Sequence, residues 1–371
     1  MPLNHNFWNP YRFVPVRDEI RREAPLTGET FKSKAHSGAI RCRLTNVSPL
    51  YIGVNANASS RPMYASKQEL IPGSSLKGML RSLAELVGGG CPVTYNNRVT
   101  YKLPRNLYPC YDTKQLCIAC RMYGMMVESR LLKGKVFIGD AHLTAGDGRT
   151  RDMDVYLGSP KAAHEAFYRS PASGIFDGMA RKLYFHQPLQ KDKLTVPSGR
   201  AVERKWRIQA LPHGHVFRFE IQFQNLTDAE LSLLLYTVAL EEQVTVSTRL
   251  NDKERLTLTG PLLHKLGNAK ALGGGSCRIE VENLSFLAPP AIRFASLTSS
   301  GTKSFEGAEL NAELQRLTAC HRDDTAPTME QLRIMMVWDE NDPRDFRFPD
   351  YLWFKAPGNS RIALKGIRGD G

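Results

Sequence analysis

The segment from His215 to Gln224, with the sequence HVFRFEIQFQ, alternates strictly between apolar and polar side chains. Its apolar residues recur at every second position, and they are Phe217, Phe219, Ile221 and Phe223. A period of two residues is that of a β-strand with one buried face, so the segment predicts a strand whose apolar side belongs to the core. Directly after it, Thr227 and Glu230 have the spacing of a capping box, which predicts a helix from 227 to about 243.

The first half of the chain shows the same order of elements. Residues 39–46 alternate in character and predict a strand, residues 74–87 predict a helix that stops at three glycines, and residues 134–143 predict the next strand. In the second half, residues 277–286 predict the strand after the helix. Two strand–helix–strand halves predict an α+β protein with a modified ferredoxin-like core, of the type found in RNA-recognition motifs (RRM).

The remaining segments divide the chain further. Residues 88–134 are rich in cysteine, and residues 147–205 are polar and rich in Arg, Tyr and Pro. We interpret both segments as insertions into the core. Residues 1–286 then form the core with its two insertions. Residues 287–371 form a C-terminal extension, with a helix predicted near 305–319.

The segment Ile71–Ser82, with the sequence IPGSSLKGMLRS, joins a Pro-Gly turn and two serines to the start of a helix. Ser74 or Ser75 can cap this helix, which leaves backbone N–H groups free to face an anion. Lys77 and Arg81 are four residues apart and therefore share one helix face. The order of residues does not fit the nucleotide-binding P-loop, which needs G-x-x-x-x-G-K-[ST]. We interpret the segment as a phosphate cradle, and a plain capped helix is the alternative.

The net charge of +13 is concentrated in one part of the chain. Residues 61–218 carry 25 Lys and Arg against 12 Asp and Glu, whereas residues 219–371 carry 17 against 21. A concentrated positive field favours a polyanionic partner, and nucleic acid is the commonest one. A soluble basic protein without such a partner is the alternative.

Composition excludes several other classes. The hydrophobic content of 42% and the charged content of 23% are typical of a soluble globular protein. No apolar run reaches the roughly 18–20 residues that span a bilayer, and the start MPLNHNF lacks the features of a signal peptide. Seven cysteines, an odd number, argue against a disulfide framework and for a reducing compartment. We therefore expect a cytoplasmic protein.

Four of the seven cysteines lie within 30 residues, and they are Cys91, Cys110, Cys117 and Cys120. The last two form a C-x-x-C turn, which lets two thiolates reach one tetrahedral Zn²⁺, and the other two complete a Cys₄ site. Such a site has no open position, so we expect a structural zinc that stabilises the 88–134 insertion. Four unligated, buried thiols are the alternative. A redox role fits less well, because the C-x-x-C does not follow a strand of a thioredoxin-like unit.

Several short segments occur in an order typical of one family, and they are Asn9–Pro15, Pro49–Gly53, Ile71–Ser82, Cys120–Gly124, Phe137–Ala141, Tyr156–Pro160, Arg181–His186 and His264–Ser276. Together they resemble the RAMP superfamily, the repeat-associated proteins that form the backbone of class 1 CRISPR effector complexes. They look most similar to the type III-D branch and the related type VII backbone subunit. The resemblance covers about residues 7–286.

This resemblance implies an RRM-like palm, a thumb-like hairpin within residues 147–205, and copies that stack head to tail along a CRISPR guide RNA. It also implies complementary target RNA, other effector subunits and a separate nuclease subunit as partners. The residues expected to bind RNA are Ser74, Ser75, Lys77, Arg81, Tyr168, Arg181, Lys182, Lys265 and Lys270. A protein that packs single-stranded RNA regardless of sequence needs phosphate contacts rather than base-edge readers, which agrees with these residue types.

Target-cleaving relatives carry an aspartate in the loop before the cradle helix. Here residues 53–70 contain no aspartate, and their only acid is Glu69. Asn55 and Asn57 cannot transfer a proton near neutral pH or bring negative charge to a metal as a carboxylate does. This difference implies a subunit without nuclease activity of its own. The alternative is an RNA endonuclease that cleaves target or repeat RNA, with His36 as a candidate general base.

Other candidates have ordinary explanations. Asp147, Asp152 and Asp154 have the residue type for a divalent ion, but acids in a Gly/Arg loop are usually a solvated turn. His142 and His186 are candidate metal or RNA contacts. The aromatic residues of the second insertion are candidate wedges between bases or the insertion's own small core, and they are Tyr168, Phe176 and Tyr184.

Overall fold

The computed structural model describes most of the chain, and the residues that it describes are 8–26, 35–53, 64–65, 68–92, 105–156, 180–190, 192–194, 205–250, 253–288, 290–293, 301–349, 353, 356–359 and 362. The predicted loop residues Asn55 and Asn57 and the predicted wedge residues Tyr168 and Phe176 lie outside these ranges. The same is true of the side chain of Glu69.

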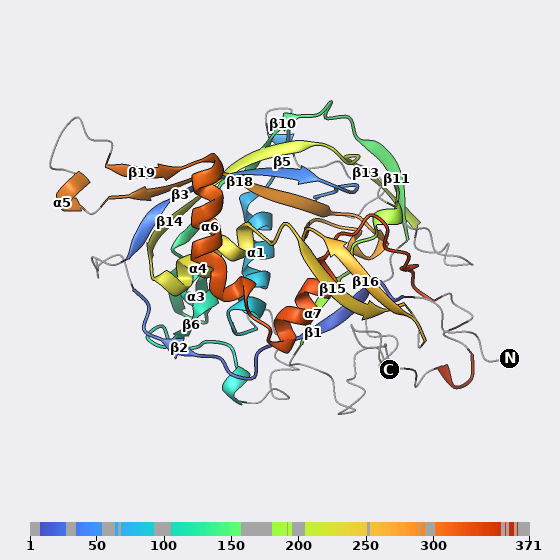
Figure 1. Cartoon of the computed structure of the whole chain (residues 1–371), viewed down its shortest axis with the longest axis horizontal. Helices are drawn as coiled ribbons and strands as arrows, with labels where there is room; N and C mark the ends of the chain where they lie inside the picture. Colours follow the sequence, from blue (N-terminus) through green and yellow to red (C-terminus); the bar gives the residue numbers. More distant parts are fainter. Residues whose placement is uncertain are drawn as a thin grey trace.

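A nine-stranded antiparallel sheet curls around two helices (Figure 1). Its path is β17 (His264–Lys265), β18 (Ser276–Leu287), β3 (His36–Asn46), β14 (Val216–Leu226), β10 (Ala141–Ala145), β5 (Gln68–Ile71) and β4 (Tyr64–Ala65). Two strands lie off this path: β9 (Val136–Ile138) pairs with β14, and β19 (Thr302–Phe305) pairs with β18.

The central elements follow the ferredoxin-like order. Helix α1 (Gly73–Val87) comes after β3, and helix α4 (Asp228–Val238) comes after β14, so the chain runs β-α-β-β-α-β. In space the last of these strands, β18, pairs with β3, which pairs with β14, and β9 and β10 pair with the other edge of β14. The predicted α+β class with a ferredoxin-like core is confirmed.

Shorter elements surround this core. The pairs of strands are β1 (Tyr11–Pro15) with β12 (Ala180–Tyr184), β2 (Arg22–Glu23) with β6 (Leu116–Cys117), β7 (Gly124–Val127) with β8 (Arg130–Lys133), β11 (Arg151–Tyr156) with β13 (Lys205–Ala210), and β15 (Val244–Arg249) with β16 (Arg255–Gly260). The further helices are α3 (Ile118–Tyr123), α5 (Pro290–Arg293), α6 (Gly307–Arg322) and α7 (Pro327–Met336), with 3-10 turns at Arg105–Leu107, Pro188–Gln190 and Lys270–Leu272. None of the described helices is long and apolar enough to cross a membrane.

Buried and exposed side chains alternate along β14, as predicted for a strand with one buried face. Phe217, Ile221 and Phe223 are almost completely buried, whereas Arg218 and Gln222 are exposed on the opposite face. The predicted strand 134–143 is instead two strands, β9 and β10, separated at Gly139 and Asp140. At this break the N–H of Gly73, the first residue of α1, donates to Oδ1 of Asp140 over 2.7 Å.

Helix α4 ends at Val238, five residues before the predicted end at about 243. Beyond it, Glu241 accepts hydrogen bonds from the Tyr236 hydroxyl and from Nε of Arg333 on α7, both at 2.8 Å. The following residues form the β15–β16 hairpin, which the sequence analysis did not predict. The helix predicted near 305–319 is confirmed as α6.

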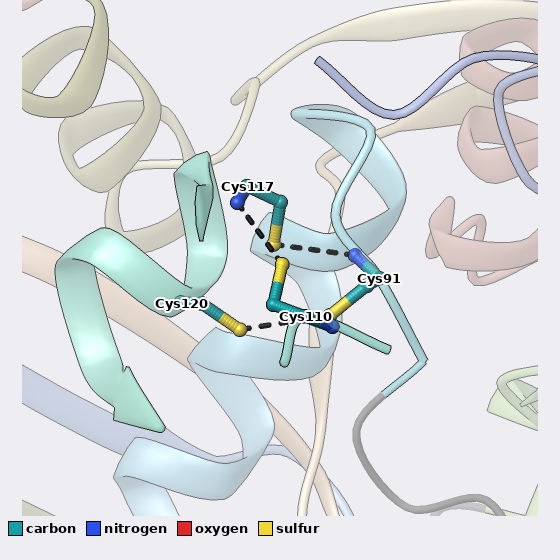
Figure 2. A group of neighbouring side chains, drawn as sticks. All are labelled: Cys91, Cys110, Cys117 and Cys120. Atoms are coloured by element: carbon teal, nitrogen blue, oxygen red, sulfur yellow. Dashed lines mark hydrogen bonds between the residues drawn. The ribbon is translucent and has the colours of Figure 1, made fainter. Parts of the chain in front are cut away.

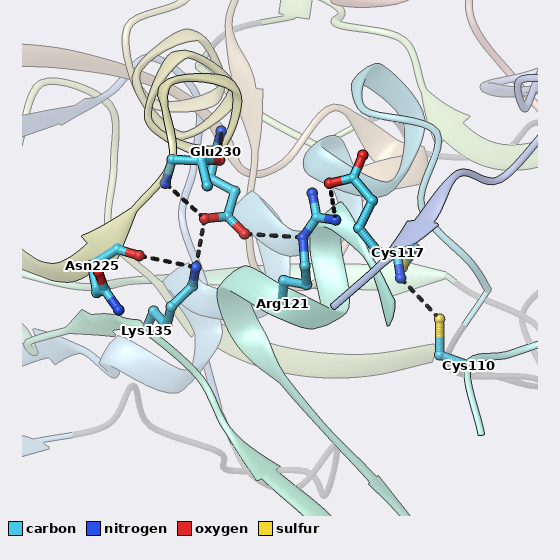
Figure 3. A network of polar contacts seen from close by, with 8 residues as sticks. Cys110, Cys117, Arg121, Lys135, Asn225 and Glu230 are labelled. Atoms are coloured by element: carbon cyan, nitrogen blue, oxygen red, sulfur yellow. Dashed lines mark hydrogen bonds and ion pairs between the residues drawn. The ribbon is translucent and has the colours of Figure 1, made fainter. Parts of the chain in front are cut away.

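A buried carboxylate joins the helix α4 to the cysteine-rich segment (Figure 3). Glu230 completes the predicted capping box with Thr227, and its side chain has no exposed surface. One carboxylate oxygen accepts from Nε of Arg121 on α3 over 3.1 Å, and the other accepts from the ammonium group of Lys135. Arg121 also donates to Glu23 on β2 over 2.7 Å. Glu230 therefore connects α4 with α3 and with the start of β9.

The substitution Glu230→Gln should destabilise the protein by about 3–5 kcal/mol, because it leaves Lys135 and Arg121 buried without this negative charge. The measurement is the free energy of unfolding in urea. Asp228→Asn is the matched control, since Asp228 lies in the same helical turn but its side chain is 92% exposed. Equal losses in the two variants would contradict the role of the buried carboxylate.

Candidate functional site

A cleft with a volume of about 600 Å³ lies along one side of α1. The opposite walls are β12, residues 51–53 and the glycine-rich segment from Leu263 to Lys270. Four of the residues predicted to bind RNA line it, and they are Ser75, Lys182, Lys265 and Lys270. The fold thus brings together predicted residues from three separate parts of the chain.

Helix α1 contributes a mixed polar and apolar face to this cleft. Ser75, Met79 and Ser82 follow helical spacing and therefore share a face, with Gly78 between them. A Cβ atom added at Gly78 would meet no atom within 4 Å. Within the described part of the chain, the space beside Gly78 is therefore open to a ligand.

Backbone hydrogen bonds attach the glycine-rich segment to the chain near Tyr51. Asn268 donates its backbone N–H to the carbonyl of Tyr51, and Gly275 donates to that of Pro49, at 2.9 and 2.8 Å. Gly275 has a φ of +78°, and a Cβ atom there would lie 1.8 Å from the carbonyl oxygen of Leu266. Glycine is needed at this position because both the backbone conformation and the close contact exclude a side chain.

Three lysines in the cleft are poorly solvated. Burial lowers the pKa of Lys265 to about 7 and that of Lys182 to about 8, and burial also lowers the pKa of Lys270. The Lys265 ammonium group donates to Oγ of Ser276 over 3.0 Å, and the Lys182 ammonium group lies 3.7 Å from the centre of the Tyr11 ring. An anion in the cleft would stabilise the charged form of each lysine.

His186 also lines the cleft, but its imidazole is fully engaged. Nδ1 lies 2.8 Å from Oγ of Ser276, and Nε2 lies 3.1 Å from the carbonyl oxygen of Leu263. Burial lowers the pKa of His186 well below its usual value, so the ring is neutral. We interpret His186 as a structural residue of the cleft wall.

The amino end of α1 differs from the predicted cradle. The N-cap residue is Pro72, so Ser74 and Ser75 lie in the first turn and neither caps the helix. The carboxylate of Asp140 already accepts the first N–H, that of Gly73. The prediction of a serine cap is therefore wrong. Ser74 is exposed, and Ser75 faces the cleft.

The predicted cations Arg81 and Arg181 both meet Glu85. Arg81 donates from Nε to Glu85 over 3.1 Å, from one terminal nitrogen to the carbonyl of Gly124 over 2.9 Å, and from the other to Sγ of Cys120 over 3.4 Å. Arg181 pairs with the second oxygen of Glu85. Lys77 is half-buried, and burial together with the charge of Arg81 lowers its pKa. RNA binding by Lys77, Arg81 and Arg181 stays a prediction.

The four predicted metal ligands lie together (Figure 2). Sγ of Cys91, Cys110, Cys117 and Cys120 all lie within 4.8 Å of one another, and all four residues are buried. A tetrahedral ion with bonds of about 2.3 Å needs sulfur atoms roughly 3.8 Å apart, so the cluster has the size of a metal site. Among the described residues, this is the group that brings three or more metal-binding side chains together.

Backbone donors and neighbouring thiols surround the sulfur atoms of the cluster. Backbone N–H groups of Cys91, Cys110 and Cys117 donate to sulfur atoms of the cluster at 3.2–3.4 Å. Hydrogen bonds among the four thiols lower the pKa of Cys110 and raise those of Cys91 and Cys120. The thiolate is the form that binds metal. The Cys₄ cluster can therefore hold a metal ion such as zinc.

The other candidates do not converge on a site. Asp147 pairs with His215, and Asp154 pairs with Arg207, each over 3.2 Å, so the predicted acidic group is divided between two partners. His36 lies 2.6 Å from Asp228, at the start of α4. His142 is exposed on β10, opposite Arg218. Tyr184 lines the cleft next to Lys182.

Sequence reasoning missed Glu85 and Asp140, which together determine how α1 meets its neighbours. The signal for Glu85 was its position four residues after Arg81, the spacing of a helical ion pair. Asp140 carried no comparable signal, because its partner Gly73 is 67 residues away in the chain.

Comparisons with known proteins identify the family of the chain. The RAMP superfamily model matches residues 43–278, almost two thirds of the chain. Among solved structures, a chain of a "Type IV-B CRISPR Complex" aligns with 71% of this chain and 96% of its own length, at 14% sequence identity and a TM-score of 0.34. No curated protein matches the sequence.

The lowered pKa of Lys265 predicts how stability depends on pH. Above about pH 7 the folded protein loses the Lys265 proton, whereas the unfolded chain keeps it to about pH 10, so this residue makes stability rise with pH in that window. Between about pH 7.5 and 9.5, the slope of the free energy of unfolding against pH should be smaller in Lys265→Met. The difference should correspond to roughly one proton. Lys114→Met, at an exposed lysine, is the control. An unchanged slope in Lys265→Met would contradict the burial of this ammonium group.

Proposed function

Because the chain belongs to the RAMP superfamily, we propose that it is a guide-RNA-binding backbone subunit of a class 1 CRISPR effector complex. In this proposal it belongs to the type III-D or type VII kind, its copies oligomerise along the spacer RNA, and they present that RNA for pairing with target RNA. Its other partners are further effector subunits, among them a separate nuclease.

The observation that carries the proposal is the clustering of Lys182, Lys265 and Lys270 in one cleft beside Ser75 of α1. Poorly solvated ammonium groups favour an anion, and a ribose-phosphate strand offers one at every nucleotide. The cleft also has apolar walls, for example Met79 and Leu183, which suit the sugar and base of a nucleotide.

The exposed face of the central sheet supports the same location for RNA. RRM domains bind bases on aromatic residues of their sheet. Here that face carries cross-strand ion pairs instead, such as Arg43 with Glu280 and Arg218 with Glu282, at 3.0 and 2.9 Å. Arginines that are already paired with glutamates attract phosphate less strongly, which favours the lysine cleft.

We further propose that the chain has no nuclease activity of its own, since residues 53–70 contain no aspartate. Incubation with labelled repeat and target RNA, with and without Mg²⁺, tests this point. Cleavage that disappears in His36→Ala would instead support the endonuclease alternative.

The double variant Lys182→Ala/Lys270→Ala should weaken RNA binding and make its salt dependence less steep. The slope of log affinity against log salt should change by about 1.5, because each phosphate contact contributes about 0.7–0.9. The measurement is fluorescence anisotropy with a labelled single-stranded RNA of about 30 nucleotides at several salt concentrations.

Lys303→Ala is the control for this experiment. Lys303 pairs with Phe286, ten residues along β18 from the partner of Lys265, which places it about 33 Å from the cleft end of the strand. The slope of log RNA affinity against log salt in Lys303→Ala should match that of the unmodified chain. A double variant with an unchanged slope would show that the cleft does not hold the RNA backbone.

We propose a structural Zn²⁺ as the ion of the Cys₄ cluster, held by Cys91, Cys110, Cys117 and Cys120. The Cys₄ donor set supports zinc, because the four sulfurs fill all four positions around a tetrahedral ion. When bound, the ion would join the end of α1 to α3 by four covalent ligands.

Elemental analysis of the purified chain should give about one zinc per chain. Cys110→Ser should lower both the zinc content and the free energy of unfolding, because it removes one of four ligands. Cys320→Ser, at an exposed cysteine outside the cluster, should change neither. A folded chain that binds no metal would refute the site.

A further inference from the structure

We propose that the Cys₄ metal centre and the lysine cleft are energetically coupled, with Arg81 and Glu85 as the positioning residues between them. A metal ion in the cluster then tightens RNA binding in the cleft, and RNA tightens metal binding. This inference rests on the proposed function, since it assumes RNA in the cleft and a metal ion in the cluster.

The coupling begins at Cys120. Its sulfur accepts a hydrogen bond from Arg81 over 3.4 Å, so Arg81 is an outer partner of a metal ligand. Such partners orient the ligand and respond to its charge. A metal-bound sulfur is a thiolate, and a thiolate attracts a guanidinium group more strongly than a neutral thiol does.

Helix α1 contacts both the cysteine cluster and the cleft. Arg81 donates to Cys120 and Glu85 pairs with Arg181, while Ser75 and Ser82 of the same helix line the cleft. Burial raises the pKa of Glu85, and the charges of Arg181 and Arg81 oppose this effect. Glu85 is only 6% exposed, so its carboxylate depends on both arginines to remain charged.

Arg181 completes the connection to the cleft. It lies on β12 and pairs with Glu85, and its buried Nε has no acceptor in the part of the chain that the structure describes. The next residue, Lys182, lines the cleft. Successive residues of a strand point to opposite sides, so an anchored Arg181 fixes the position from which Lys182 reaches the ligand.

The chain of contacts therefore runs from Cys120 through Arg81, Glu85 and Arg181 to Lys182. Without the metal, Cys120 is no longer held by a bond to the ion, so Arg81 loses a fixed acceptor. Arg81 then changes its contact with Glu85, which weakens the pair of Glu85 with Arg181. Strand β12 is then no longer held in place by that pair. Coupled sites typically change each other's affinity by about 5- to 150-fold, and linkage requires the same factor in both directions.

The test uses the full-length chain loaded with zinc and a labelled single-stranded RNA. Removal of the metal by a chelator should weaken RNA binding on the order of tenfold in fluorescence anisotropy, while circular dichroism follows the fold. In the reverse experiment, a coloured chelator competes for zinc with and without RNA. RNA should lower the amount of zinc that the chelator extracts. The factor by which RNA raises the affinity for zinc should equal the factor by which zinc raises the affinity for RNA.

Glu85→Gln should weaken RNA binding to about the level of the metal-free chain, because it releases Arg181, and it should remove the effect of zinc and RNA on each other. Glu23→Gln is the matched control. It makes the same change at a carboxylate beside the cluster, which contacts Arg121, the neighbour of Cys120, and it should keep the coupling. This comparison remains decisive if the metal-free chain unfolds, because both variants are measured in the zinc-loaded state.

Arg81→Ala separates the positioning role from direct RNA contact. As a positioning residue, Arg81 should leave the salt slope of RNA binding unchanged when it is removed, whereas loss of a phosphate contact would lower the slope by about 0.7–0.9. RNA binding that does not depend on zinc, together with zinc affinity that does not depend on RNA, overturns the coupling and leaves the proposed function intact. A zinc-loaded chain that binds no RNA overturns the proposed function itself.

Discussion

The buried carboxylate of Glu230 holds the two halves of the protein together. It has no exposed surface, and it neutralises Arg121 of the cysteine-rich segment and Lys135 at the start of β9. An unpaired charge in the interior is strongly unfavourable, so each of these side chains requires the others. Glu85 acts in the same way between Arg81 and Arg181. The position of the cysteine cluster on the ferredoxin-like core depends on these two glutamates.

The cleft depends on this arrangement, because β12, one of its walls, is attached to α1 through the pair of Arg181 with Glu85. The amino end of α1 is occupied by Asp140, so the positive charge available to a ligand comes from the side of the helix and from the segments opposite it. Lys182 and Lys265 approach from β12 and β17, which belong to different sheets.

Much of the core was predictable because its signals are local. The period of two in β14 and the capping box at Thr227 each lie within a few residues, and both are confirmed. The cysteine cluster was predictable because four like ligands in a short segment have few other uses. The β15–β16 hairpin was missed although Val244 and Val246 alternate with polar residues, because the preceding helix was extended across Ala239.

By itself, the sequence determined the main strands and helices of the ferredoxin-like core and the residue types of the candidate site, since these follow from periodicity, capping and composition within short segments. Only the tertiary structure decided which partner each charged residue meets. Arg81 was expected to face phosphate beside Lys77, but it contacts Cys120, 39 residues away. A guanidinium group has five donors and a long side chain, so its direction depends on the acceptors that distant segments bring near it.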